Sequence, residues 1–265
     1  MIKIHSPGRF EQLPHAVLFD FDNTFYAYGP AHAAGMEATR TKAMGAFSIS
    51  AEQFDQAFKA ARGEIKARLG ATASSHNRLL YFQNLLEAIG LGSQVLLALD
   101  FEQTYWRSYL VAARLFPGSM AFLDDLRLAG IPAAVVTDLT AQIQLRKMVY
   151  FGLDRHFECV VTSEEVGHDK PHEAMFRLAL EKLQPAGTVV WMIGDNAEKD
   201  IAGARDAIGA VTIQIEHAHT DSPSAASPPA DATFTDFADL GRLLQQLAAG
   251  SASAAPSHVA PQSGS

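Results

Sequence analysis

The sequence predicts an α/β protein with a doubly wound parallel sheet and a helical segment inserted after the first strand. Three observations support this prediction. An apolar run at 16–19 ends in two acidic residues, Asp20 and Asp22. The segment from 31 to 113 shows only helical periodicity, whereas strand-like and helix-like segments alternate from 119 to 215. Such alternation is typical of a parallel sheet whose strands are connected by helices.

The composition limits the kinds of function that the chain can have. Its 265 residues are 48% hydrophobic, which is enough for one large domain or two unequal ones. A net charge of -8 argues against a nucleic acid polymer or an anionic membrane surface as a partner, although local basic side chains can still bind a small anion. The single cysteine, Cys159, excludes an intramolecular disulfide and a cysteine-rich zinc site. No apolar run is long enough for a leader or a membrane span, so a cytoplasmic protein is expected.

The first strand is expected at about residues 16–20. A short apolar run bounded by turn-forming residues is typical of a buried strand in a parallel sheet, and ligands bind such sheets at the carboxyl ends of their strands. Asp20 and Asp22 stand at that end. Two carboxylates this close repel each other unless they share a proton or a cation, and a divalent metal ion with oxygen ligands is the simplest partner. The alternative interpretation is a helix cap or a solvated loop.

The inserted segment is expected to form about four helices. Apolar residues recur there at spacings of three and four, and Ser50 with Gln53 resembles a capping box at a helix start. These apolar stripes indicate the packed core of a small helical bundle rather than a cofactor site. The stripes are formed by Phe54, Phe58, Ala61, Ile65 and Leu69, by Leu79, Phe82, Leu86 and Ile89, and by Leu96, Leu99, Trp106, Leu110 and Ala113.

Beyond the insertion, strands and helices are expected to alternate. The predicted strands cover 131–137, 157–162, 188–194 and 210–215. The predicted helices cover 119–129, 141–151, 172–183, 198–208 and a closing helix at 237–247. Residues 1–14 are expected to be a polar lead-in and 217–232 a loop. The predicted division is a core of 15–28 and 116–248, a helical cap of 29–115, and a disordered tail of 249–265.

Each later core strand also ends in chemically useful side chains. The run Ala133 to Val136 is followed by Thr137 and Asp138. A lysine, Lys170, lies in an HDKP stretch after the next strand. The strand that ends at 194 is followed by three polar residues, Asp195, Asn196 and Asp200. These side chains are expected to gather at the same edge of the sheet as Asp20.

Four motifs in this order resemble the haloacid dehalogenase superfamily of hydrolases, in the subfamily with a helical cap of the C1 type after the first strand. The motifs are DFDNT at 20–24, VVTD at 135–138, HDKP at 168–171 and GDNAEKD at 194–200. The resemblance covers roughly residues 15–248 and implies a Rossmann-like core beneath the cap. It also implies Mg²⁺ as the cofactor.

The resemblance assigns roles to individual residues. It implies that Asp20 is the nucleophile that forms an aspartyl-phosphate, and that Asp22 is the general acid and base. Mg²⁺ would be held by the Asp20 carboxylate, the backbone carbonyl of Asp22, and Asp195. Lys170 would neutralise negative charge on the nucleophile and on the phosphoryl group.

Further residues are implied around these groups. Thr137, with Asp138, belongs to the phosphate-binding stretch. Asp200, Thr24 and Asn196 are expected to hold the metal ligands and the catalytic groups in position without bonding the metal directly. Asp138 stands where the family often has Asn or Gly, so its charge must be paired or turned away from the phosphate. The neighbouring Lys199 is expected to face solvent.

The leading functional hypothesis is a Mg²⁺-dependent phosphatase of small phosphomonoesters, of the nucleotide or sugar phosphate class. A phosphomutase with the same chemistry is the main alternative. A dehalogenase is disfavoured by Asp22, because carbon–halogen cleavage needs no acid there, and a non-catalytic binding module is disfavoured by the intact acidic set. The expected partner is a small phosphorylated substrate, and the oligomeric state is not predicted.

The cap is expected to set specificity by closing over the site. The candidate residues that could face the substrate are Tyr26, Tyr28, Arg40, His76, Asn77 and Arg78. Each of them is also explained as an ordinary surface or packing residue. Three cap lysines, Lys42, Lys59 and Lys66, carry no signature of a Schiff-base role.

Overall fold

The computed structural model describes residues 1–217 and 229–253. Its centre is a seven-stranded sheet with the order β1-β7-β6-β5-β2-β3-β4. Neighbouring strands are parallel, except that β1 runs antiparallel to β7. The strands are β1 (Lys3–Ile4), β2 (Ala16–Phe19), β3 (Ala133–Thr137), β4 (Cys159–Thr162), β5 (Val190–Gly194), β6 (Val211–Ile215) and β7 (Ala232–Phe234). The predicted α/β class and parallel sheet are confirmed.

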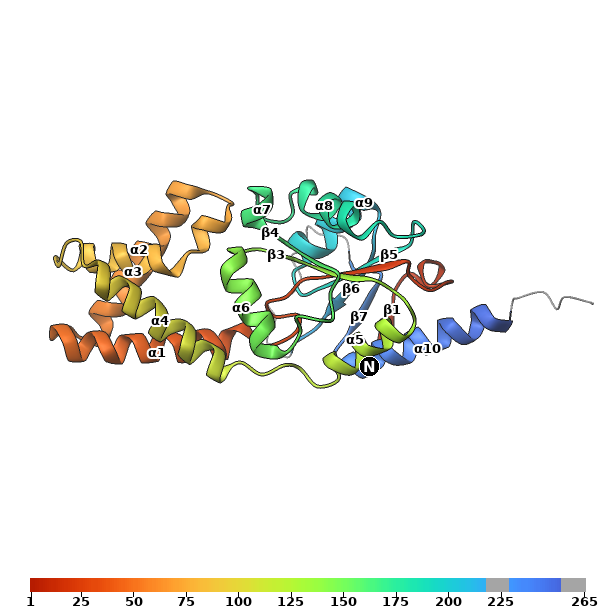
Figure 1. Ribbon diagram of the computed structural model, residues 1–265, viewed down its shortest axis with the longest axis horizontal. Helices are drawn as coiled ribbons and strands as arrows, with labels where there is room; N and C mark the ends of the chain where they lie inside the picture. Colours follow the sequence, from red (N-terminus) through yellow and green to blue (C-terminus); the bar gives the residue numbers. More distant parts are fainter. Residues whose placement is uncertain (218–228, 254–265) are drawn as a thin grey trace, which may run out of the picture.

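Helices cover both faces of this sheet, and the helices of the insertion stand at one end of the molecule (Figure 1). The helices of the insertion are α1 (Tyr28–Phe47), α2 (Ala51–Leu69), α3 (Arg78–Ala88) and α4 (Val95–Ala112). Those of the core are α5 (Ser119–Leu128), α6 (Ala141–Phe151), α7 (Ser163–Val166), α8 (Glu173–Leu183), α9 (Gly203–Ile208) and α10 (Phe237–Ser253). Short turns of 3-10 helix lie at η1 (Pro7–Arg9) and η2 (Ala73–His76), and a π-helical segment, η3 (Ala197–Ala202), precedes α9.

The apolar character of β2 follows from its position between two layers of helices. Ala16 and Leu18 pack in the layer of α8 and α9, while Val17 and Phe19 pack in the layer of α5, α6 and α10. All four side chains are fully buried. A strand of a parallel sheet is covered on both faces, so it reads as a continuous apolar run rather than an alternating one.

The centre of the sheet is also the point where the direction of winding changes. β2 pairs with β3 on one side and with β5 on the other, and Phe19 lies opposite both Val135 and Ile193. The chain therefore diverges from β2 toward both edges. In open α/β sheets the crevice outside the carboxyl ends of the strands at such a point is where ligands bind. The acidic residues after β2 and β5 lie there.

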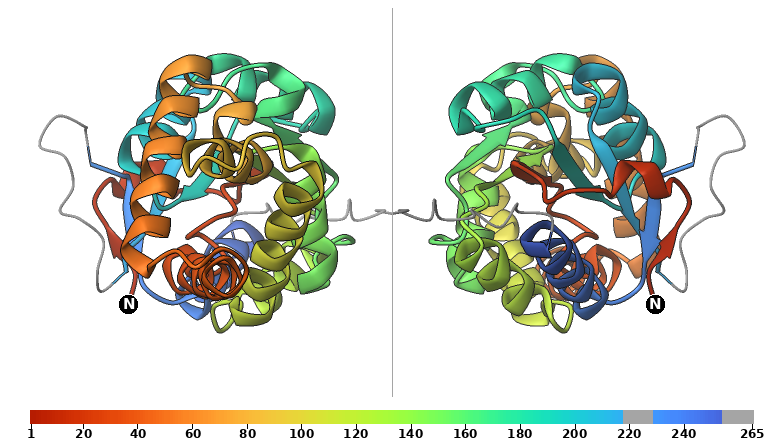
Figure 2. Two further views of the ribbon diagram at one scale, coloured as in Figure 1. Left: turned by 90° about the vertical axis from the view of Figure 1, so that its left-hand side faces the viewer. Right: turned by 90° about the vertical axis from the view of Figure 1, so that its right-hand side faces the viewer.

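The insertion between β2 and β3 folds into a bundle of its own, with α1 against α4 and α2 against α3. Viewed from the cap end, the bundle covers one end of the core (Figure 2, left). The predicted capping box is present, since Ser50 Oγ accepts from Gln53 N and Gln53 Oε1 accepts from Ser50 N. Gly35 lets α1 approach α4 closely, because a Cβ there would lie 2.8 Å from the Tyr105 ring. The predicted stripe is wrong at Leu96 and Leu99, which are exposed.

The structure also corrects the sequence prediction at the chain ends. The lead-in contains β1, and the end of the predicted loop at 217–232 opens β7. Both strands are too short to give a readable periodicity. The last helix extends to Ser253, so the predicted start of the tail at 249 is too early. The rest of the predicted tail, from 254, and residues 218–228 of the predicted loop lie outside the described residues. The domain boundaries remain predictions. Within 1–217 and 229–253, no helix has the length and apolarity needed to cross a bilayer.

Candidate active site

Three predicted carboxylates meet at the carboxyl ends of β2 and β5. Asp20 follows β2 directly, Asp195 follows β5, and Asp200 lies in η3. One carboxylate oxygen from each lies within 4.8 Å of the others. Gly194 makes this approach possible, because a Cβ there would lie 2.5 Å from Asp200 Oδ2. The three carboxylates form an acidic cluster of the kind that could hold a metal ion.

Lys170 connects two members of this cluster. Its Nζ donates to Asp20 Oδ1 at 2.6 Å, to Asp200 Oδ1 at 2.7 Å and to the Val136 carbonyl at 2.9 Å. The lysine is only 3% exposed. Burial by itself lowers the pKa of Lys170, but the charges of Asp20 and Asp200 outweigh burial and raise that pKa. The side chain is therefore a fixed cation between the two carboxylates.

A single lysine leaves the acidic cluster with an excess of negative charge. Burial raises the pKa of Asp20 well above its ordinary value, and the charges of Asp200 and Asp195 add to this against the opposing effect of Lys170. Burial, followed by the charge of Asp200, raises the pKa of Asp195 to about 7. A second cation would relieve this excess of negative charge. A donor set made only of carboxylate oxygens fits a hard divalent ion such as Mg²⁺.

Two smaller polar residues hold the acidic cluster in place. Thr24 Oγ1 donates to Asp20 Oδ2 at 2.8 Å, so both oxygens of Asp20 have a partner. Asn196 caps η3, and its Oδ1 accepts from the backbone N–H groups of Glu198 and Lys199. The Asn196 N–H donates to Asp200 Oδ2 at 3.0 Å. Thr24 and Asn196 thus lie where supporting residues were expected.

Asp22 is bound to a lysine that sequence reasoning missed. Lys147 Nζ donates to Asp22 Oδ1 at 2.6 Å and to Oδ2 at 2.9 Å. Tyr26 OH also donates to Oδ1, and Gln144 Nε2 donates to Oδ2 at 3.3 Å. Burial raises the pKa of Asp22, but Lys147 and these hydrogen bonds outweigh burial, and the pKa falls below its ordinary value. Asp22 is therefore set as an anion in this structure.

Lys147 lies at the junction of the core and the cap. It projects from α6 and its side chain is 1% exposed. Its Nζ lies 5.8 Å from the centroid of the Tyr26 ring, 5.5 Å from that of Trp106 and 5.4 Å from that of Tyr109. Gln144 and Lys147 are spaced three apart on the buried side of α6, beside apolar Ile143 and Met148. Polar residues on an apolar helix face were the signal that could have revealed them.

Asp138 is paired, as its position beside a phosphate site requires. Its Oδ2 lies 2.6 Å from Lys199 Nζ, and its Oδ1 accepts from the Lys170 N–H at 2.8 Å. The expectation that Lys199 faces solvent holds for part of the side chain, which is 37% exposed, while its Nζ is paired with Asp138. Thr137 is buried, and its Oγ1 accepts from Gln144 Nε2 at 2.7 Å.

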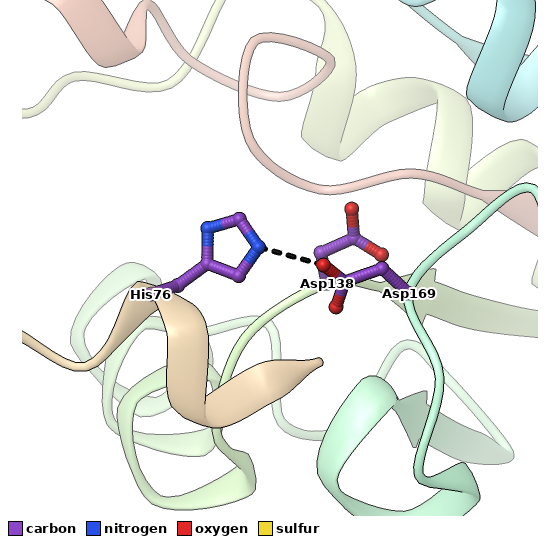
Figure 3. A group of neighbouring side chains, drawn as sticks. All are labelled: His76, Asp138 and Asp169. Carbon is purple, nitrogen blue, oxygen red and sulfur yellow. Dashed lines mark hydrogen bonds and ion pairs between the residues drawn. The ribbon is translucent and has the colours of Figure 1, made fainter. Parts of the chain in front are cut away.

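A histidine of the cap contacts the core beside this stretch. His76 in η2 lies near Asp138 and Asp169 (Figure 3), and its Nε2 is 2.8 Å from Asp169 Oδ2. The Asp169 N–H also donates to the Ala71 carbonyl at 3.0 Å. The potential ligand atoms of the three side chains lie within 4.8 Å of one another. Because Asp138 is already paired with Lys199, we interpret this group as a contact that holds the cap against the core.

The cap candidates separate into two groups. Tyr28, His76 and Arg78 line a pocket of about 270 Å³ together with the acidic cluster. Arg62 and Lys66 also line it, although neither is among the substrate-facing residues that the sequence predicts. The other candidates do not line this pocket and have other roles. Arg40 pairs with Glu37 and Asp55, Asn77 caps α3, Tyr26 bonds Asp22, and Lys42 pairs with Asp100.

A doubly wound sheet with an acidic cluster at its switch point, beneath a helical cap, defines a capped α/β enzyme of the Rossmann-like type. The family model of haloacid dehalogenase-like hydrolases matches residues 14–207. The chain belongs to this family, and the resemblance read from its four motifs is confirmed.

Relatives and solved structures agree with this assignment. The chain is 38% identical over 223 residues to a ribulose-1,5-bisphosphate 5-phosphatase of Halopiger xanaduensis, covering 83% of this chain and 91% of that protein. It is 30% identical over 200 residues to a glyceraldehyde 3-phosphate phosphatase of Methanopyrus kandleri, covering 76% and 83%. A 2-haloacid dehalogenase of Pseudomonas syringae shares the fold, with a TM-score of 0.68 and 21% identity over 88% of this chain and 99% of that one. That likeness concerns the fold alone.

Proposed function

We propose that this protein is a Mg²⁺-dependent phosphatase that hydrolyses small phosphomonoesters through an aspartyl-phosphate on Asp20. The observation that carries the proposal is the position of Asp20, which Lys170 and Thr24 hold at the switch point of the sheet beside Asp195. The names of the relatives support phosphoester hydrolysis as the reaction. Asp22 favours it over dehalogenation, because an alkoxide leaving group needs a proton donor and a halide does not.

The first half of the reaction is attack by an Asp20 oxygen on phosphorus, with release of the alcohol. The Asp20 and Asp195 carboxylates and the Asp22 backbone carbonyl would hold Mg²⁺. The ion would offset the repulsion between the acidic cluster and an anionic substrate. Lys170 is already placed to neutralise charge on the attacked phosphoryl group. Thr137 and the Asp138 stretch would orient the phosphoryl oxygens.

The second half is hydrolysis of the aspartyl-phosphate by a water that Asp22 deprotonates. The lowered pKa of Asp22 suits this step, since a base must be unprotonated to accept the proton. Protonation of the leaving alcohol requires the opposite form. Asp22 therefore has to loosen its bonds to Lys147 when substrate binds, so that it can carry a proton to the leaving oxygen.

Sugar phosphates are the substrate class that we favour over nucleotides. The two relatives described above are named for ribulose 1,5-bisphosphate and glyceraldehyde 3-phosphate, and both are covered over most of their length. A pyrimidine 5'-nucleotidase of Escherichia coli, in contrast, matches over only 43% of this chain. A pocket of about 270 Å³ also suits a compact substrate.

The test is phosphate release from p-nitrophenyl phosphate and from a panel of sugar phosphates, with and without Mg²⁺. We expect turnover that needs Mg²⁺ and that falls at least about a thousandfold in Asp20→Asn, which cannot form the acyl phosphate. The exposed Asp154→Asn variant is the matched control and should keep wild-type rates. Turnover that survives in Asp20→Asn would overturn the covalent route.

A further inference from the structure

The pocket has two sides of opposite charge. Its floor is the acidic cluster of the core, and its cap side carries three basic residues from two helices, Arg62 and Lys66 of α2 and Arg78 of α3. The phosphoryl chemistry proposed above uses Lys170 on the floor, so it leaves all three cap cations without a role. Their position on the lining of the same pocket calls for an explanation.

Arg78 is buried and has no carboxylate partner among the residues that the structure describes. It is 7% exposed, and it donates to the His76 carbonyl at 2.7 Å and to Tyr28 OH at 2.6 Å. Its Nε has no hydrogen-bond partner. Its remaining surroundings are aromatic, with ring centroids of Tyr81, Tyr105 and Trp106 at 5.4, 5.5 and 5.6 Å. A buried cation without a counterion is costly, so a bound anion is the missing element.

Arg62 and Lys66 enlarge this unpaired positive charge. Neither forms an ion pair within residues 1–217 and 229–253, whereas Arg68, on the same helix, pairs with Glu64. Burial and then the charges of Arg62, Lys199 and Arg78 lower the pKa of Lys66. These cations therefore repel one another in the free protein. A dianion between them would relieve that repulsion.

We infer that Arg62, Lys66 and Arg78 form a binding site for a second phosphate group of the substrate. The preferred substrates are then small bisphosphates, with one phosphate at Asp20 and the other beneath the cap. This inference rests on the proposed function for the reacting phosphate, but its own evidence is the unpaired cap cations. An arginine is suited to the role, because its planar guanidinium binds phosphate through two parallel hydrogen bonds.

The test compares binding of ribulose 1,5-bisphosphate and ribulose 5-phosphate, which differ by one phosphate. Isothermal titration of Asp20→Asn in Mg²⁺ measures affinity without turnover. We expect the bisphosphate to bind at least about tenfold more tightly, as charge-assisted hydrogen bonds to one added dianion predict. Arg78→Met and Arg62→Gln, each in the Asp20→Asn background, should reduce this preference. Arg68→Gln in the same background, the control on α2, should keep it.

Stability measurements separate binding from folding. Arg78→Met removes an uncompensated charge from an aromatic setting, so its melting temperature without ligand should equal or exceed that of the parent. If Arg78→Met does not fold, the exposed Arg62→Gln variant still decides the question, because it should lose part of the preference while its melting temperature stays unchanged.

The outcomes distinguish this inference from the proposed function. Equal affinity for the two ribulose phosphates, or a preference that persists in both variants, overturns the second-phosphate site even if phosphomonoesters are hydrolysed. Tighter binding of 3-phosphoglycerate than of the bisphosphate also overturns it, in favour of a carboxylate site. A bisphosphate preference that depends on Arg62 and Arg78, in a protein that hydrolyses nothing, upholds the site while the proposed function fails.

Discussion

At the scale of single residues, the least expected feature is the partner of Asp22. A carboxylate two residues after the nucleophile was expected to exchange protons with substrate and water, and the structure places a buried lysine on both of its oxygens. The pKa of Lys147 is itself lowered by burial, against the effect of Asp22. The two side chains thus depend on each other for their charges. Lys147 is best regarded as a positioning residue that controls when Asp22 is free to act.

Replacing Lys147 with Met should raise the pKa of Asp22, because burial then acts without an opposing cation. The acid limb of the kcat profile should move to higher pH, since Asp22 must be ionised to activate water for hydrolysis of the aspartyl-phosphate and would stay protonated to a higher pH. At acidic pH, kcat should fall about ten- to a hundredfold for alkyl phosphates and for 2,4-dinitrophenyl phosphate alike, because the hydrolysis step no longer contains the leaving group. Lys182→Met, which breaks a more exposed pair with Glu165, is the control. An unmoved acid limb would contradict the role of Lys147.

Asp195 gives a second prediction, because its pKa is raised to about 7. A carboxyl with a raised pKa in the folded state is protonated there while the unfolded chain is ionised. Without metal, stability should therefore fall as the pH rises from about 4 to about 7. Mg²⁺ binds the ionised form, so it should raise the melting temperature more at about pH 8 than at about pH 5. Thermal melts with and without Mg²⁺ check this, and Asp195→Asn should weaken both dependences, while Asp20, whose pKa is also raised, keeps part of them.

At the scale of elements, the sequence predicted those strands that have a clear local pattern of apolar residues. The central strands are continuous apolar runs, and each was placed to within about two residues, which is the usual uncertainty of an element end. β1 and β7 were missed because strands of two and three residues have no periodicity of their own. Their existence depends on pairing with strands distant in the sequence, β1 with β7 and β7 with β6.

The candidate site also contains residues that local sequence predicts and residues that only tertiary packing reveals. Asp20, Asp195 and Lys170 were predicted because each immediately follows or closely trails a strand in a motif. Lys147 and Arg62 were not assigned to the site, because the residues next to them in the sequence do not indicate which element their helices pack against. Their positions follow from how α6 meets the cap and how α2 overhangs the core, which are matters of tertiary packing.

The contact between α1 and α4 yields a prediction at this scale. In Gly35→Ala, the added methyl group would lie 2.8 Å from buried Tyr105 ring atoms and 3.0 Å from the Tyr105 carbonyl. We expect a loss of about 1–3 kcal/mol in unfolding free energy, since packed helices do not separate without cost. Gly45→Ala is a control on the exposed side of the same helix, where a Cβ meets nothing within 4 Å. It should be neutral or stabilising by up to about 1 kcal/mol. Equal melting temperatures in the two variants would contradict close packing at Gly35.

At the scale of the whole molecule, the site exists only where cap and core meet. The core supplies the acidic cluster and Lys170, while the cap supplies Arg78 and the aromatic rings around Lys147. The fold by itself does not select the reaction, since a haloacid dehalogenase has the same architecture. Substrate choice must therefore depend on how the cap is held, and His76 with Asp169 is the contact that holds it beside the pocket.

Asp169→Asn tests that contact with little change in volume. Burial raises the pKa of Asp169, but the hydrogen bond to His76 outweighs burial together with smaller effects, and the pKa is lowered. The wild-type carboxylate is therefore ionised near neutral pH, and its contact with His76 is lost only in acid. The variant should weaken closure by about 1–2 kcal/mol. We expect KM to rise about fivefold to twentyfold with a smaller change in kcat, because substrate binding must then supply the energy of closing. The radius of gyration of the free variant, measured by small-angle X-ray scattering, should exceed that of the wild type. Asp124→Asn, which disrupts the pair with His156 away from the cap, should change neither quantity. If both variants keep wild-type KM and dimensions, the cap is held by its other contacts with the core, and the histidine pair has no part in closure.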